Sequence, residues 1–196
     1  MNKTLQQIQL EVATWATSNF PNRKDYQPLL GIIEELGELC HAHLKAEQGI
    51  RTNEDHKEKK LDACGDIIIY LLDYCNVNNI TLDDKRVIEY DRSILSQEIL
   101  FNISRHIGKL ANSHYAEQIK FLALIEIHEI INCVWAYAYY HLNMELVDIV
   151  NNVWNAVKLR DWQKHPDNGV DWDIDNSPNI QFIEERDWDK LKEVNP

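Results

Sequence analysis

Two groups of carboxylates interrupt apolar helical stretches early in the chain, and they constrain its fold more than any other feature. Glu34, Glu35 and Glu38 form the first group, and Asp62 and Asp66 form the second. An ionised carboxylate that is buried without a partner is strongly destabilising, so such groups are normally paired or bound to a metal ion. We therefore expect the two stretches to lie side by side and to bring their acids into one site.

Helix geometry determines which of these acids can act together. Residues three or four apart lie on the same face of an α-helix, so Glu35 and Glu38 point together, and Glu34 shares the face of Glu38. By the same spacing, Asp62 faces Asp66. If the two helices are antiparallel neighbours, the acids meet in one pocket of hard oxygen ligands, the type that Mg²⁺ prefers.

The rest of the chain favours helices. A length of 196 residues is consistent with one domain and a sizeable core. Only 6 Gly and 5 Pro occur, and they are clustered instead of recurring at turn spacing. Apolar residues recur at helical spacing over most of the sequence. We therefore predict an all-α fold, an antiparallel helical bundle.

The spacing also gives approximate helix boundaries and a domain organisation. A first helix begins near Leu5 and stops before Pro21. Further helices are predicted over 29–46, 54–76, 94–112, 116–141 and 145–164, with short helical segments over 81–91 and 180–191. Together they suggest a single all-α domain over 1–165, followed by an acidic C-terminal extension over 166–196.

A weak internal repeat divides the domain at about residue 92. The segment 35–39 (ELGEL) matches 106–110 (HIGKL), and 70–74 (YLLDY) matches 135–139 (WAYAY). A metal-binding half over 1–92 paired with a degenerate half over 93–165 would produce this pattern, as a pseudo-dimer. The alternative is chance similarity between amphipathic helices.

Composition excludes several classes of partner. The net charge of −12 argues against binding a polymeric nucleic acid through a basic face. The apolar run 67–72 is far too short to cross a membrane, and no signal peptide is visible. The 4 cysteines lie in apolar helical segments without zinc-type spacing, as is typical of a reducing compartment. We expect a soluble, cytoplasmic protein.

The acidic motifs resemble those of a known family. The segment EELGE over 34–38, followed by a polar loop and DACGDIIIY over 62–70, resembles the MazG family of all-α nucleoside triphosphate pyrophosphohydrolases. Their signature is E-E-x-x-E followed by E-x-x-D on the next helix. The resemblance covers about residues 5–90, and more loosely 153–169 (VWNAVKLRDWQKHPDNG), which is similar to the closing segment of phage-type members.

The resemblance implies a reaction and an assembly. It implies hydrolysis of (deoxy)nucleoside triphosphates to monophosphate and pyrophosphate, in the sanitation or control of nucleotide pools. The implied cofactor is Mg²⁺, with Mn²⁺ as a substitute. Relatives dimerise or tetramerise through their helices, so a homo-oligomer, most simply a dimer, is expected.

The motif match also assigns roles to single residues. Glu35, Glu38 and Asp66 match metal ligands of the family, and Glu34 matches the first acid of the motif. Where the family has Glu three residues before the Asp, this chain has Ala63, and Asp62 lies one residue earlier. Four residues is close to one helical turn, so Asp62 still faces Asp66 and is expected as the fourth ligand.

Other residues are expected to act on the substrate. We expect Glu34 or Glu35 to orient the attacking water, because this helix carries more carboxylates than one ion needs. Substrate-binding residues are expected to be the cations that reach the phosphates and the aromatics that match base-stacking positions of related enzymes: Lys59, Lys158, Arg160, Trp15 and Tyr70. The alternatives are a solvated helix face for each cation and core packing for each aromatic.

Three functions are compatible with these residues. The leading hypothesis is a Mg²⁺-dependent pyrophosphohydrolase. The second is a MazG-like nucleotide-binding or regulatory protein with little or no turnover, which Ala63 and the degenerate second half would explain. The third is a helical interaction module whose acids are only solvated. Pyrophosphate release separates the first from the second, and metal binding separates the third from both.

Overall fold

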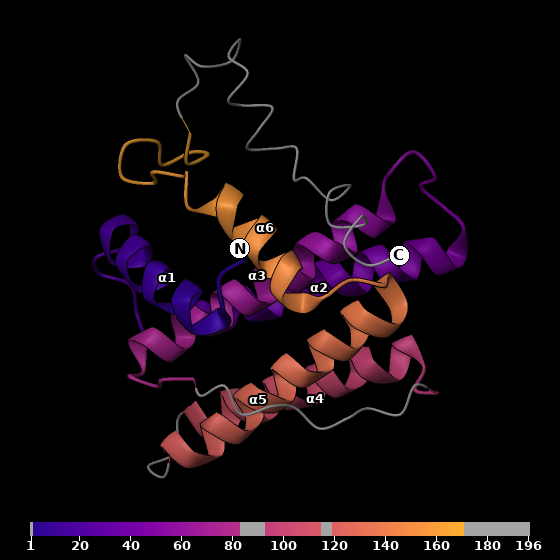
Figure 1. The fold of residues 1–196 in the computed structure, drawn as a ribbon, viewed down its shortest axis with the longest axis horizontal. Coiled ribbons are helices and arrows are strands. Elements are labelled where there is room, and N and C mark those ends of the chain that lie inside the picture. Colours follow the sequence, from indigo (N-terminus) through magenta and orange to yellow (C-terminus); the bar gives the residue numbers. More distant parts are fainter. Residues whose placement is uncertain (1, 83–92, 115–118, 171–196) are drawn as a thin grey trace.

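The computed structural model describes residues 2–82, 93–114 and 119–170, and within these ranges it contains helices and no strand (Figure 1). The all-α prediction is confirmed. The helices are α1 (Leu5–Asn19), α2 (Gln27–Gln48), α3 (His56–Val77), α4 (Ser96–His114), α5 (Ile119–Tyr137) and α6 (Leu146–Val157). A π-helical turn, Ala138–Leu142, extends α5.

Local sequence signals account for where the first helices begin and end. Thr4 and Gln7 form a capping box at the start of α1, each side chain accepting a hydrogen bond from the backbone N–H of the other. The Asp55 carboxylate accepts the N–H groups of Lys57 and Glu58 at the start of α3. Gly49 caps the C-terminal end of α2, and its φ of 63° is the left-handed conformation that glycine adopts without strain.

The last described helix is shorter than its sequence predicts. Apolar spacing predicts a helix over 145–164, but α6 ends at Val157. The N–H groups of Leu159 and Arg160 bond carbonyls only three residues back, and the Asp161 N–H donates instead to the distant Gly169 carbonyl at 2.7 Å. The hydrogen bond to Gly169 therefore turns the chain out of the helix, and the spacing of apolar residues cannot predict such a bond.

Helix α3 lies at the centre of the fold. It contacts α1, α2 and α6, and α2 and α3 form a hairpin beside a second hairpin of α4 and α5 (Figure 1). The side chains of Leu61, Ile67, Ile68 and Leu71 on α3 are fully buried. A helix that buries side chains all round belongs in the core. This central helix therefore gives the acids at Asp62 and Asp66 a rigid support.

Some sequence predictions concern residues outside the described ranges. The short helical segment predicted over 81–91 and the one over 180–191 lie wholly or almost wholly outside the described residues, as does most of the acidic extension. The hairpins α2–α3 and α4–α5 fall in the two halves of the suggested repeat, and the pseudo-dimer stays a prediction. None of the helices described is long and apolar enough to cross a membrane.

A close approach between α3 and α6 depends on Gly65. A Cβ atom at Gly65 would clash with the side chain of the buried Val153 on α6. We expect Gly65→Ala to reduce the free energy of unfolding by about 1–3 kcal/mol, because overpacking a dense core forces neighbours to shift. Gly108→Ala is the matched control, since nothing lies within 4 Å of its Cβ, and it should be stabilising by about 0.5–1 kcal/mol. Thermal melts followed by circular dichroism would test both, and a Gly65→Ala protein as stable as the wild type would contradict this packing.

Candidate functional site

One pocket gathers most of the residues that the sequence singles out. Its volume is about 400 Å³, within the range of small-molecule sites, and it lies between α1, α2, α3 and the segment that follows α6. The acids that line it are Glu34, Glu35, Asp66 and Asp73, the cations are Arg23 and Arg160, and the aromatic residues are Trp15, Phe20, Tyr70 and Trp162.

The register of α2 against α3 explains why these residues meet. The ring of Tyr70 packs directly on Gly31, where an added Cβ atom would lie 2.5 Å from the ring carbons. The Glu35 carboxylate is close enough to Asp66 to raise the pKa of the Asp66 carboxyl. These two pairs step in opposite directions along the two helices, so the hairpin is antiparallel. The antiparallel neighbours expected from the sequence are thus present.

Asp66 is the most perturbed carboxyl of this site. Burial raises its pKa to about 8, and the negative charges of Glu35 and Glu38 act in the same direction. The Arg160 guanidinium acts in the opposite direction and favours the ionised form. The ionised form of Asp66 is therefore poorly solvated in the pocket and is repelled by Glu35 and Glu38. A bound cation would relieve that repulsion.

The acids of the pocket suit a metal ion by the type of ligand atom that they offer and by their charge. Within residues 2–82, 93–114 and 119–170, no three His, Cys, Asp or Glu side chains are gathered closely enough to hold an ion as they stand. The acids nonetheless offer only hard oxygen ligands, which suit Mg²⁺ better than a soft or imidazole-preferring metal. The donor set thus fits Mg²⁺ by its chemistry, without forming a ready-made cage.

The remaining two predicted ligands lie at the edge of this arrangement. Glu38 is exposed on α2, one turn after Glu34, and its charge reaches Asp66. Asp62 is half-buried on α3, one turn before Asp66. Neither is among the residues that line the pocket. The antiparallel register carries Glu38 toward Asp62, which makes them neighbours of the pocket's acidic end.

Tyr70 lines the pocket one turn of α3 after Asp66. Its side chain is 37% exposed, and its ring lies against Gly31. Burial raises the pKa of its phenol to about 12, and the charges of Glu35 and Asp66 add to this effect. The hydroxyl therefore stays protonated and remains a hydrogen-bond donor near the acids.

The segment after α6 brings Arg160 and Trp162 to the pocket through contacts with α1. The indole Nε1 of Trp15 donates to the Arg160 carbonyl at 3.0 Å, and the Trp162 N–H donates to the side-chain oxygen of Asn19 at 2.6 Å. The Arg160 guanidinium lies 5.9 Å from the centre of the Trp162 ring, a cation–π distance. Trp15 also lines the pocket, and its indole N–H fixes the position of Arg160 in this wall. Its role in stacking on a base stays a prediction.

The two predicted lysines are placed differently. Lys59 forms an ion pair with Glu54 at 2.6 Å near the start of α3. Lys158 donates to the side-chain oxygen of Asn155 at 2.6 Å, just after α6 ends. Neither lines the pocket, whereas Arg160 does. Among the cations predicted to reach the phosphates, Arg160 alone borders the acidic residues.

Sequence reasoning missed an ion pair on the pocket wall. Arg23 precedes α2 and bonds Asp73 of α3, fifty residues away. Asp73 carries a signal in the sequence, because it follows Asp66 by seven residues and so returns to the same helix face. Arg23 carries none, since it lies in a loop where no periodicity applies.

Comparison of the chain with protein-family models, with characterised proteins and with solved structures finds no match. The features that point to a function are therefore the pocket and the motifs at 34–38 and 62–70. Kinship with the MazG family, expected from those motifs, stays a prediction.

Proposed function

We propose that this chain is a MazG-like pyrophosphohydrolase that converts nucleoside triphosphates to monophosphates and pyrophosphate with Mg²⁺. The observation that carries the proposal is the pocket lined by Glu34, Glu35 and Asp66 together with Arg160 and Tyr70. It combines acids that could hold a hard cation, a guanidinium suited to phosphate oxygens, and an aromatic wall. The acids and the guanidinium are groups that assist transfer of a nucleotidyl group to water, and the aromatic wall suits the face of a base.

Electrostatics explains why acids and a cation are both needed. A triphosphate is highly anionic, so Glu35 and Asp66 alone would repel it. Mg²⁺, or Mn²⁺ in its place, held by Glu35, Glu38, Asp62 and Asp66 would supply positive charge to the phosphates and lower the pKa of a bound water. Arg160 adds a fixed charge, and its planar fork can donate two parallel hydrogen bonds to phosphate oxygens.

The chain's own residues then account for the proton and the leaving group. Glu34 or Glu35 accepts a proton from the attacking water as its oxygen bonds to the α-phosphorus. The bond from that phosphorus to the bridging oxygen breaks, and pyrophosphate leaves with the electron pair. Arg160 stabilises the negative charge that develops on the phosphate oxygens.

One observation favours a second function. Across the described ranges, no three candidate ligands are gathered as a ready-made metal site. A nucleotide-binding or regulatory protein with little turnover would keep the pocket and not need that geometry. Binding without pyrophosphate release would favour this alternative.

Pyrophosphate release from a panel of ribo- and deoxyribonucleoside triphosphates tests the proposal. With Mg²⁺ or Mn²⁺ present, we expect turnover of at least one triphosphate by the wild type. Glu35→Gln removes a carboxylate proposed to hold the ion or to accept the proton, and it should reduce turnover by about 10²–10⁴-fold. Glu98→Gln, which changes an exposed acid on α4, is the control and should retain activity. Absence of release across the panel from folded, nucleotide-binding protein would contradict hydrolysis.

A further inference from the structure

A mostly buried ion pair, Arg23 with Asp73, lies at the end of the pocket away from Glu35 and Asp66. Arg23 Nη2 lies 3.1 Å from Asp73 Oδ1, and Arg23 Nε lies 3.2 Å from Asp73 Oδ2. The two side chains are only 13% and 12% exposed, yet both line the pocket. An ion pair that served only to fasten the loop before α2 would not have to face this cavity.

Helix spacing sets how far this pair lies from the acidic end. Asp73 follows Asp66 by seven residues, which is two turns of α3 and on the order of 10 Å. Tyr70 lies between them on the same face, packed on Gly31. A ligand whose phosphates reached Glu35 and Asp66 would therefore extend past Tyr70 toward Arg23 and Asp73.

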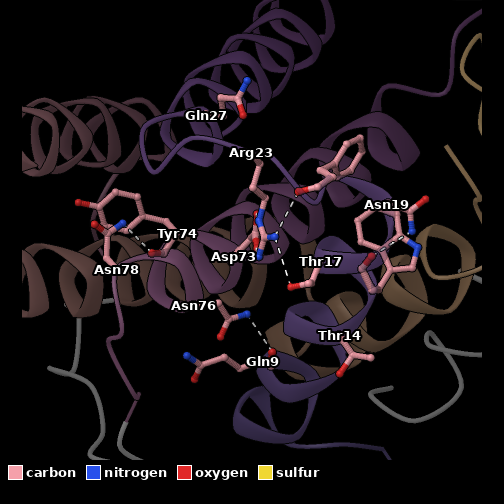
Figure 2. A network of polar contacts seen from close by, with 12 residues as sticks. Gln9, Thr14, Thr17, Asn19, Arg23, Gln27, Asp73, Tyr74, Asn76 and Asn78 are labelled. Atoms are coloured by element: carbon pink, nitrogen blue, oxygen red, sulfur yellow. Dashed lines mark hydrogen bonds and ion pairs between the residues drawn. The ribbon is translucent and has the colours of Figure 1, made fainter. Parts of the chain in front are cut away.

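Both members of the pair have hydrogen-bonding capacity left. Figure 2 shows Arg23 between Asp73 on one side and Thr17 on the other. Its Nη1 is 3.4 Å from Thr17 Oγ1 and 3.5 Å from the Phe20 carbonyl, both at the long limit for a hydrogen bond. A ligand acceptor could offer Nη1 a shorter bond.

The carboxylate also has room for another donor. An ionised carboxylate has about four lone-pair positions, and Arg23 takes two of those on Asp73. Burial raises the pKa of Asp73 even though the adjacent guanidinium lowers it. A further N–H donor would therefore stabilise the charged form. Asp73 can only accept and Arg23 can only donate, so together they fit an edge that offers a donor beside an acceptor.

The pocket that contains this pair also has aromatic walls that suit a flat ring. Phe20 and Trp162 both line the pocket, with ring centres 6.5 Å apart and planes tilted by 34°. Planar heterocycles bind such aromatic walls through their faces while polar groups bond their edges. Among ligands that also carry phosphates, a nucleotide base has this combination of a flat face and an edge with adjacent donor and acceptor.

We infer that Arg23 and Asp73 are specificity-determining residues that recognise the edge of a nucleotide base. Asp73 accepts a hydrogen bond from a base N–H, and Arg23 donates to the neighbouring ring nitrogen or carbonyl oxygen. The inference rests on the proposed function, since it assigns a role to the other end of the same pocket. It requires that an abasic sugar phosphate bind much more weakly than at least one nucleotide.

Equilibrium binding of nucleoside monophosphates tests this without requiring hydrolysis. The probes are the four deoxyribonucleoside monophosphates and deoxyribose 5-phosphate, titrated by calorimetry against the whole 196-residue chain. We expect the wild type to prefer one base over the abasic probe by about 10- to 100-fold, the value of one or two hydrogen bonds to a charged group. Asp73→Asn and Arg23→Lys should each lose most of that preference. Arg23→Lys keeps the positive charge but loses the planar guanidinium that can donate two parallel hydrogen bonds. It therefore tests the inference even if Asp73→Asn does not fold.

A second ion pair gives a matched control. Glu126 bonds His106 at 2.6 Å in the α4–α5 hairpin, with side-chain exposures of 8% for His106 and 15% for Glu126, and neither residue lines the pocket. Glu126→Gln should leave the base preference unchanged while altering the melting temperature. An Asp73→Asn protein that melts lower but keeps the wild-type preference would overturn the inference, as would equal wild-type binding of nucleotides and the abasic probe. Base-dependent binding without pyrophosphate release would overturn only the proposed hydrolysis.

Discussion

Asp66→Asn is expected to melt at a higher temperature than the wild type at neutral to basic pH without divalent cations, and to have lost pyrophosphate release. The pKa of Asp66 is raised to about 8, chiefly by burial and then by Glu35 and Glu38. The folded protein therefore holds a proton that the unfolded chain releases near pH 4. Folded stability falls as pH rises from about 4 to about 8, and each unit of that shift corresponds to about 1.4 kcal/mol.

Asparagine cannot ionise, so the variant should not show this loss of stability. At about pH 8 we expect its melting temperature to exceed that of the wild type by about 5–10 °C, and the difference should shrink toward about pH 4. Activity should fall by a factor of about 10³ or more if Asp66 holds the catalytic cation, because the site then lacks a charged ligand.

Addition of Mg²⁺ separates a metal ligand from an acid that is merely buried. A cation that binds only the folded state stabilises it by about 2.7 kcal/mol at a hundredfold excess over its Kd. The wild type should therefore melt at a higher temperature with Mg²⁺, whereas Asp66→Asn should respond weakly. Glu98→Gln is again the control. Equal responses of Asp66→Asn and the wild type to Mg²⁺ would remove Asp66 from the metal site.

The sequence predicts the fold well where structure is local. The capping box at Thr4, the cap at Asp55 and the glycine at Gly49 are all sequence signals, and the helices that they bound were predicted within a few residues. The prediction for α6 was wrong at its C-terminal end, because the hydrogen bonds that turn the chain there come from Gly169 and from α1. The spacing of apolar residues carries no information about hydrogen-bond partners that lie elsewhere in the sequence.

The same distinction applies to the pocket. Glu34, Glu35, Asp66 and Tyr70 could be predicted to meet, since their spacing sets the face they share on adjacent helices. The pairing of Arg23 with Asp73 could not, because it joins a loop to a helix across fifty residues. Closure of the pocket by the segment after α6 likewise depends on tertiary contacts.

Lys158 and Arg160 show that residue spacing alone does not identify which of two neighbouring cations lines the pocket. Lys158 and Arg160 lie in one short segment, and the sequence gives no reason to separate them. Trp15 bonds the Arg160 carbonyl, while Lys158 bonds Asn155 one turn back. The backbone is thus held at Arg160, whose side chain lines the pocket and whose charge lowers the pKa of Asp66.

Arg160→Ala is therefore expected to reduce kcat/KM for a triphosphate by about 10²–10³-fold, the cost of removing one preorganised group that stabilises transition-state charge. Lys158→Ala removes an equal charge two residues away and should cost much less. Arg160→Lys should fall between them, because it keeps the charge but cannot make the bidentate contact. Steady-state pyrophosphate release for the three variants would order them.

The pH profile gives an independent measure of the same contact. Arg160 favours ionised Asp66, so its removal should raise the pKa of Asp66 further. If catalysis needs the carboxylate, the acidic limb of the kcat/KM profile should move to higher pH in Arg160→Ala and stay in place in Lys158→Ala. A loss of activity without that movement would mean that Arg160 acts on the phosphates alone. Full activity in Arg160→Ala would show that the pocket does not bind triphosphates through this guanidinium.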